Sequence, residues 1–328
     1  MTKGTSKYRS PTDDPVLMEM LAARGLDEVP LYSRSRRNLP EKAWQDAFER
    51  WDSLAPDRDG PVSAAPVPVP DTDKMSAAIK RKARELGADD VGITELTPVM
   101  VNEGEEVPHK YAVSFLVQER YTEVLGGALA VEVETIDVYV RCAEISTALG
   151  KYIRDELGYP AMADHNGTHA LQAIPTMVAC GLGEMGKHGS MIHREFGAGF
   201  RPAFVMTDLP LTPDKPDLFG VQDYCMHCRL CENNCPAEAI PSSDDHIVTE
   251  GYKRWLTDVE KCYTASRLRD EYCHICVDVC PYVHKENGDP EKRLLYKLFM
   301  TKRRQAGWRT PQWFIEDEED ILAAGQRR

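Results

Sequence analysis

The chain has 328 residues, which exceeds one ordinary hydrophobic core and predicts two compact units. It contains 40 Lys and Arg residues against 53 Asp and Glu residues, a formal net charge of −13, so most of its surface would repel a polyanion such as DNA. This excess of acidic residues argues against a nucleic-acid partner. No apolar run reaches the roughly 18 residues that a membrane-spanning helix needs. The first residues also lack the apolar segment of a secretion signal, so we expect a cytoplasmic protein without a membrane span.

Residues 1–70 are predicted to form an N-terminal arm and linker. Polar and charged residues at 40–55 indicate a helical fragment, and GPVSAAPVPVP at 60–70 is typical of an extended linker with a solvated backbone. A compact unit is expected to begin directly after this linker.

Residues 71–221 are predicted to form an α/β unit. The stretch 71–73 can cap a helix that runs to Gly87, and a longer helix is expected at 136–157, ending at Gly158. Its apolar face would consist of Val138, Cys142, Ile145, Leu149, Tyr152 and Ile153. Strands are predicted at 91–93, 111–117 and 202–206, and this alternation of helices and strands favours an α/β (α+β) layer arrangement.

Ten cysteines occur in the chain, and eight of them lie between residues 225 and 280. In a reducing compartment such a concentration favours a metal site over disulfides. The first four follow Cys-x2-Cys-x2-Cys-x3-Cys-Pro, and the last four follow Cys-x10-Cys-x2-Cys-x3-Cys-Pro. The first spacing is that of ferredoxins, in which three thiolates hold one [4Fe–4S] cluster and the fourth reaches the neighbouring cluster. We therefore predict a ferredoxin-like domain with two clusters at 222–284, followed by a helical extension at 285–328.

Two [4Fe–4S] clusters need eight thiolate ligands, which is the number of cysteines in the two runs. The predicted ligands of cluster 1 are Cys225, Cys228, Cys231 and Cys280, and those of cluster 2 are Cys235, Cys262, Cys273 and Cys276. Two zinc sites or a disulfide scaffold are the alternatives, but zinc is usually held by paired Cys-x2-Cys arms without a trailing Cys-Pro. The remaining Cys142 and Cys180 fall on apolar stretches and are interpreted as packed side chains.

A glycine-rich loop, GLGEMGKHG at 181–189, contains the Gly-x-Gly-x-x-Gly spacing of dinucleotide sites, with Asp208 about 20 residues further on. That fingerprint requires a β-strand directly before the loop, whereas residues 170–180 fit a helix at least as well. The alternative is a tight connection whose glycines permit positive φ angles and let a bulky group approach the backbone. The sequence favours this second interpretation over a nicotinamide site.

The segment GLGEMGKHGSMIHREFGAGFRPAFVMTDLPL at 181–211, followed by the two cysteine runs, resembles the corrinoid and iron–sulfur reductive dehalogenases. Residues 137–158, which lead into GYPAMADHNG, and RKARELGADDVGI at 81–93 are also similar to this family, so the resemblance covers roughly residues 71–285. It implies cobalamin or a related corrinoid in the α/β unit, two [4Fe–4S] clusters and an organohalide substrate. The export signal of the respiratory members and the fused flavin reductase of larger soluble members are not seen. We therefore expect an external electron donor, such as a ferredoxin, a flavodoxin or a reductase.

The resemblance also implies roles for individual residues. Tyr139 matches the family's tyrosine proton donor, and a neighbouring cation would stabilise its phenolate. Arg201 is the first choice for this cation, and Lys187 and Arg194 are second choices. Asn166 is a candidate contact for the halide or the substrate. The predicted corrinoid-binding residues of the loop are Gly181, Gly183, Glu184, Gly186 and His188.

Two other functions compete with dehalogenation. Epoxyqueuosine reductases share the cysteine runs and corrinoid chemistry, but they bind tRNA, which a net charge of −13 disfavours. A non-catalytic iron–sulfur electron carrier would use residues 71–221 only to shield the clusters. A ferredoxin needs far fewer residues, so this alternative leaves more than half of the chain without a purpose.

Overall fold

The structure is a computed structural model that describes residues 2–3, 41–120, 128–165, 170–249, 252–268 and 273–283. Asn166 and the predicted C-terminal extension at 285–328 lie outside the described residues. No helix in the described ranges combines the length and apolarity that a bilayer crossing requires.

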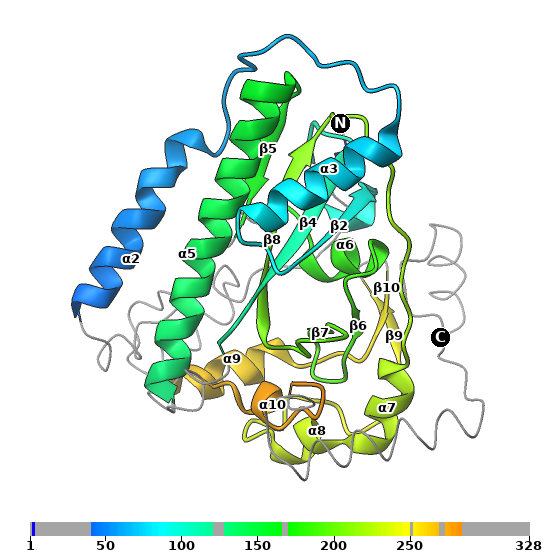
Figure 1. Cartoon of the computed structure of the whole chain (residues 1–328). Coiled ribbons are helices and arrows are strands. Elements are labelled where there is room, and N and C mark those ends of the chain that lie inside the picture. The colour runs from blue at the N-terminus through cyan, green and yellow to red at the C-terminus, as the bar shows by residue number, and fades with distance from the viewer. Residues whose placement is uncertain are drawn as a thin grey trace.

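A four-stranded sheet in the order β2-β4-β8-β5 forms the centre of the first unit (Figure 1). Its strands are β2 (Asp90–Glu95), β4 (Tyr111–Gln118), β5 (Ala161–Asp164) and β8 (Phe200–Thr207). The strands predicted at 91–93, 111–117 and 202–206 are confirmed, whereas the short strand β5 is missed by the sequence pattern. Every pairing is antiparallel, so the core is of the α+β kind.

The helices of this unit follow the predicted apolar spacing. Asp71 is the N-cap of helix α3 (Thr72–Glu85), and its carboxylate accepts a hydrogen bond from the Lys74 amide at 3.0 Å. Helix α5 (Ala128–Tyr152) continues into a π-helical turn at Ile153–Leu157 and ends at Gly158, which has a φ of 75°. A helix, α6 (Ala173–Ala179), precedes the glycine-rich loop, as expected.

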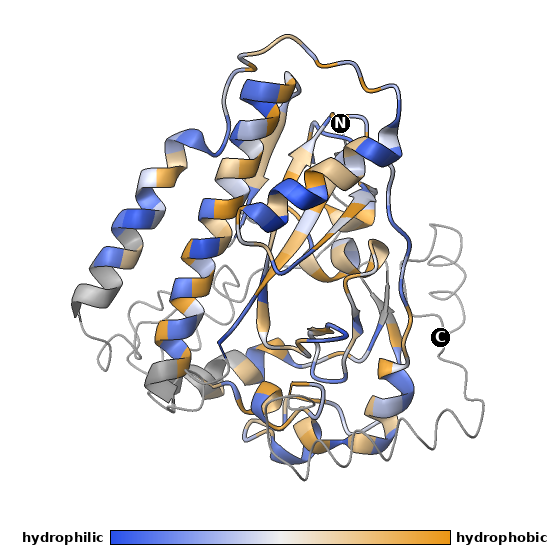
Figure 2. Ribbon diagram, viewed as in Figure 1, coloured by the Kyte–Doolittle hydropathy of each residue, from blue (hydrophilic) through white to orange (hydrophobic). Residues whose placement is uncertain are grey.

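Two apolar layers pack on opposite faces of the sheet because strand residues alternate between them. Val113, Phe115 and Val117 of β4 face the layer that contains α3 and α5, and Ala112 and Leu116 face the layer that contains α6. The whole predicted apolar face of α5 belongs to the first layer. Figure 2 shows the strands as mainly apolar and the helices α3 and α5 as mixed.

The N-terminal arm contains helix α2 (Glu41–Leu54), which confirms the predicted fragment and packs beside α5 (Figure 1). Arg50 forms ion pairs with Glu144 at 2.8 Å and with Asp137 at 3.8 Å. The linker that follows at 60–70 forms no helix or strand and is mostly exposed, as expected, but two of its amides bond to the first unit. Its Ser63 and Val67 amides donate hydrogen bonds to the carbonyls of Arg154 and Leu157 in the π-helical turn, at 3.3 and 3.0 Å.

The second unit contains short helices joined by loops. They are α7 (Val221–Cys228), α8 (Leu230–Asn234), α9 (Val259–Leu268) and α10 (Ile275–Asp278), with the hairpin β9 (Ile247–Thr249) and β10 (Tyr252–Arg254). Its core contains Trp255, Tyr224 and Tyr282, together with Cys225 and Cys280. The remaining short elements are β1 (Thr2–Lys3), β3 (Glu106–Val107), β6 (Glu184–Met185), β7 (Met191–Ile192) and 3-10 turns at Ala55–Asp57 and Pro98–Met100.

Candidate active site and metal centres

The cysteines of the second unit lie near enough to one another for their thiols to affect each other's pKa, although no three of the described His, Cys, Asp or Glu side chains are grouped closely enough to form a ready-made metal site. Burial raises the pKa of the Cys225 thiol well above its ordinary value, and the nearby Cys280, Cys231 and Cys228 thiols raise it further. Cys280 comes from the second sequence run, yet it lies with the three cysteines that begin the first. These four are the predicted ligands of cluster 1.

The predicted ligands of cluster 2 influence one another in the same way. Burial, followed by the Cys273 and Cys235 thiols, raises the pKa of Cys262 to about 11. Cys276 lies near cysteines of both predicted sets, because after burial the Cys262, Cys231, Cys273 and Cys280 thiols raise the pKa of its thiol. All eight of these thiols are free, as are Cys142 and Cys180. Ionisation of one thiol disfavours ionisation of its neighbours, and a bound cation would offset this repulsion by stabilising the thiolates. The ligand assignment itself stays a prediction.

The structure brings the predicted proton donor and the first-choice cation together. Tyr139 lies half-buried on α5, and the guanidinium carbon of Arg201, on β8, is 5.2 Å from the centre of its ring. The Arg201 Nη2 also donates a hydrogen bond to the Thr135 hydroxyl at 3.3 Å, one helical turn before Tyr139. The long helix and the sheet therefore hold the two side chains face to face.

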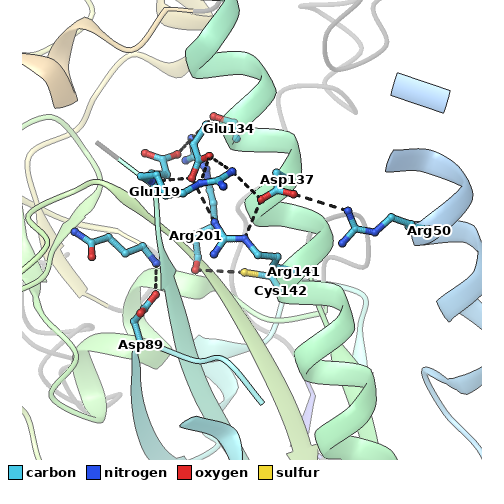
Figure 3. Close-up of polar contacts among 11 residues, drawn as sticks. Arg50, Asp89, Glu119, Glu134, Asp137, Arg141, Cys142 and Arg201 are labelled. Carbon is cyan, nitrogen blue, oxygen red and sulfur yellow. Dashed lines mark hydrogen bonds and ion pairs between the residues drawn. The ribbon is translucent and has the colours of Figure 1, made fainter. Parts of the chain in front are cut away.

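A buried carboxylate that the sequence analysis missed fixes this arginine. Val117 pairs with Arg201 in the antiparallel register of β4 and β8, so Glu119 lies two residues further on the same face of the sheet. Its Oε1 is 2.7 Å from the Arg201 Nη2 (Figure 3), and its side chain is 2% exposed. No local motif marks Glu119, because its partners come from other segments of the chain.

Glu119 also joins the active site to the cluster 2 neighbourhood. Its Oε2 is 3.3 Å from the Nε2 of His274, which lies between Cys273 and Cys276, and the His274 Nδ1 is 2.9 Å from Asp278. Burial opposes ionisation of Glu119, but Arg201 and His274 hold its pKa below the ordinary value. The carboxylate thus lies between Arg201 and His274, which both favour its charged form.

The other proposed cations lie elsewhere. The Lys187 ammonium has its partners at residues 232–255 of the second unit, and Arg194 pairs with Asp217 at 2.5 Å and stacks over Phe219. Of the three cations, Arg201 is the one that the structure shows against the Tyr139 ring.

The glycine-rich loop packs against the second unit. The β6–β7 hairpin is so tight that a Cβ on Gly183 would lie 2.5 Å from the Ile192 carbonyl oxygen, and one on Gly186 would lie 3.0 Å from the His188 ring. Gly181 has a φ of 80°, in the left-handed region that favours glycine. These glycines are explained by packing within the protein, and their predicted role in cofactor binding stays a prediction.

Glu184 of this loop stabilises the helix that carries Cys225 and Cys228. Its Oε1 accepts hydrogen bonds from the amides of Phe219, of Gly220 at 2.7 Å and of Val221 at 3.5 Å, at the start of α7. The carboxylate therefore satisfies free amides and interacts favourably with the positive end of the helix dipole.

Replacing Glu184 by alanine is expected to lower the free energy of unfolding by about 1–3 kcal/mol, because buried amides lose their acceptor. Glu184→Gln keeps one acceptor oxygen and should cost less. Anaerobic denaturant unfolding followed by circular dichroism would measure both, with the exposed Glu85→Ala as the matched control. Equal stability of Glu184→Ala and the control would contradict the capping role.

His188 supplies a buried hydrogen-bond donor. Its Nδ1 accepts from the Ser190 amide at 3.1 Å, which places the proton of the neutral ring on Nε2. Burial, followed by the charge on His274, lowers the pKa of His188 to about 4, so the ring is neutral at pH 7. Within the described ranges the Nε2 has no hydrogen-bond partner. Such a donor fits a ligand with carbonyl or amide groups.

Comparisons with known proteins cover both units. Residues 224–283 match the family described as a 4Fe-4S dicluster domain, and this range contains all eight predicted cluster ligands. The tetrachloroethene reductive dehalogenase of Desulfitobacterium hafniense is 32% identical over 184 residues, 53% of this chain and 33% of that protein. The enzyme of the same name from Sulfurospirillum multivorans is 34% identical over 150 residues, 44% of this chain and 29% of that protein. The chain thus spans about a third of the length of these relatives.

An epoxyqueuosine reductase of Leadbetterella byssophila is 32% identical over 118 residues, 31% of this chain and 34% of that protein. Among solved structures, a catabolic reductive dehalogenase in complex with 3-bromo-4-hydroxybenzoic acid has a TM-score of 0.69 and 28% identity, over 85% of this chain and 41% of that one. A reductive dehalogenase described as B12-dependent has a TM-score of 0.68 and 29% identity, over 78% of this chain and 39% of that one.

Proposed function

Because the chain is a homologue of the reductive dehalogenases, we propose that it removes halide from an organohalide by reduction. In this reaction two electrons and one proton convert the carbon–halogen bond into a carbon–hydrogen bond, and the halogen leaves as halide. The observation that carries the proposal is the pairing of Tyr139 with Arg201, linked by Glu119 to His274, which lies between Cys273 and Cys276 at the start of α10. A proton source and a route for electrons thereby meet in one place.

The second unit would hold two [4Fe–4S] clusters. The neighbourhood of Cys225, Cys228, Cys231 and Cys280 fits cluster 1, and that of Cys235, Cys262, Cys273 and Cys276 fits cluster 2. Thiolates are the preferred ligands of iron–sulfur clusters, whose potentials depend on burial and on hydrogen bonds to sulfur. The two clusters would relay single electrons from an external donor toward the first unit.

A corrinoid fits the first unit because His188 offers a buried, neutral donor that has no protein partner in the part of the chain that the structure describes. When bound, the corrinoid would supply low-valent cobalt able to engage the carbon–halogen bond. Tyr139 would donate the proton to carbon, since its phenol is half-buried and therefore reachable. Arg201 would stabilise the resulting phenolate, and Glu119 would hold Arg201 in place.

The fold comparison favours an enzyme over an electron carrier. The likeness to solved dehalogenases extends over 78% to 85% of the chain and so includes the first unit as well as the cysteine unit. A net charge of −13 disfavours the tRNA substrate that an epoxyqueuosine reductase would need. Cytoplasmic localisation is part of the proposal.

An anaerobic reconstitution experiment tests this function. The full chain, supplied with iron, sulfide and hydroxocobalamin and then desalted, is expected to retain about eight iron atoms and one corrinoid. With a strong reductant such as titanium(III) citrate it should release halide from tetrachloroethene or 3-bromo-4-hydroxybenzoic acid. Absorbance and paramagnetic-resonance spectra would count the cofactors. Loss of the corrinoid on desalting, or zinc in place of iron in oxygen-free material, would contradict the proposal.

A further inference from the structure

Lys187 is a fully buried lysine with 0% side-chain exposure in the glycine-rich loop. Its Nζ donates a hydrogen bond to the Ser243 carbonyl oxygen at 2.9 Å and lies 3.3 Å from the carboxylates of Asp244 and Glu232. The ammonium also lies 5.5 Å from the centre of the Trp255 ring. These partners all come from the second unit, so the loop inserts a positive charge into it.

This charge lies beside the cluster 1 cysteines. Glu232, whose Oε2 is 3.3 Å from the Lys187 Nζ, directly follows Cys231 on α8. The buried ammonium therefore contacts the residue next to a predicted ligand of cluster 1.

The other charges around α8 are more exposed to solvent than Lys187. The Arg229 side chain is 37% exposed and pairs with Asp244 at 2.8 Å, and Asp244 itself is 50% exposed. Glu232 is 12% exposed. Water and salt screen exposed charges much more than buried ones, so the field of Lys187 reaches the thiolates with less loss.

Reduction of an iron–sulfur cluster adds one negative charge, which a nearby buried cation stabilises. We propose that Lys187 raises the reduction potential of cluster 1 and thereby makes it a better electron acceptor within the chain. This inference rests on the proposed function, which supplies the cluster. It assigns Lys187, the sequence-based candidate for the cation at Tyr139, to electron transfer.

Lys187→Met removes the charge and keeps a side chain of similar length. The reconstituted protein would be titrated anaerobically with reductant and followed by paramagnetic resonance. One of the two clusters is expected to become reduced only at a lower potential than in the unmodified protein. We expect the ratio of reduced to oxidised cluster at a fixed potential to fall about tenfold, which for a one-electron couple is a shift of about 59 mV. Lys80→Met, which removes the ion pair with Asp214 in the first unit, is the matched control and should leave both signals unchanged.

Two further variants separate charge from packing. Lys187→Arg keeps the positive charge and should keep the potential, whereas Glu232→Gln removes a negative charge and should raise it. Unchanged cluster potentials in both Lys187→Met and Glu232→Gln would overturn the inference. If the Lys187→Met protein fails to bind its clusters, an unchanged cluster potential in Glu232→Gln would by itself overturn the inference. The titration needs no organohalide and no corrinoid, so a failure to dehalogenate would leave its result unchanged. An absence of cluster signals in the unmodified protein would instead count against the proposed function.

Discussion

Replacing Tyr139 by phenylalanine is expected to slow halide release by about 100-fold or more, while iron and corrinoid contents stay unchanged. The reason is that the substitution removes only the phenolic hydroxyl, and a positioned general acid typically contributes about 10²–10⁴-fold to a rate. The ring remains, so its contact with Arg201 is retained. Initial rates of halide release with an excess of titanium(III) citrate would measure the effect under conditions where electron supply is not limiting.

Tyr152→Phe provides the control for this variant. Tyr152 lies on the same helix, packs against the apolar core and has the Lys82 ammonium 4.9 Å from its ring centre. The control variant therefore removes the same hydroxyl from a tyrosine that does not face Arg201. Its turnover should equal that of the unmodified protein. Unchanged turnover in Tyr139→Phe would remove Tyr139 from the mechanism, and the source of the proton would then have to be another group.

Substituting Cys280 by serine is expected to abolish halide release and to halve the iron content, from about eight to about four atoms per chain. A serine hydroxyl is a harder and weaker ligand for iron than a thiolate, so cluster 1 should be lost while cluster 2 remains. Iron analysis and paramagnetic resonance of the anaerobically reconstituted protein would measure this loss.

A comparison among cysteine variants tests whether each cluster takes three ligands from one cysteine run and the fourth from the other. Cys225→Ser should give the same residual spectrum as Cys280→Ser, although the two residues belong to different runs, and Cys276→Ser should give the complementary one. Cys180→Ala, which removes a buried thiol outside both neighbourhoods, should keep all of the iron. If Cys280→Ser instead matched Cys276→Ser, the predicted ligand sets would be wrong.

Local spacing in the sequence determined the features whose partners are close along the chain. The apolar residues of α5 recur at helical spacing, and Asp71 precedes its helix as a cap should, because a helix repeats its environment every three to four residues. The short gaps between cysteines similarly indicated thiolates on one side of a small cluster. The expected loop at 181–189, preceded by a helix, is likewise a local feature.

Tertiary structure alone decided which distant groups meet. The antiparallel register of β4 and β8 places Glu119 beside Arg201, and the packing of α5 across the sheet brings Tyr139 over the same arginine. Packing of the glycine-rich loop against the second unit places the Glu184 carboxylate at the start of α7 and the Lys187 ammonium beside Glu232, which follows Cys231. The physical reason is that charge pairing depends on distances through space, which strand register and layer packing set and which residue spacing along the chain does not contain.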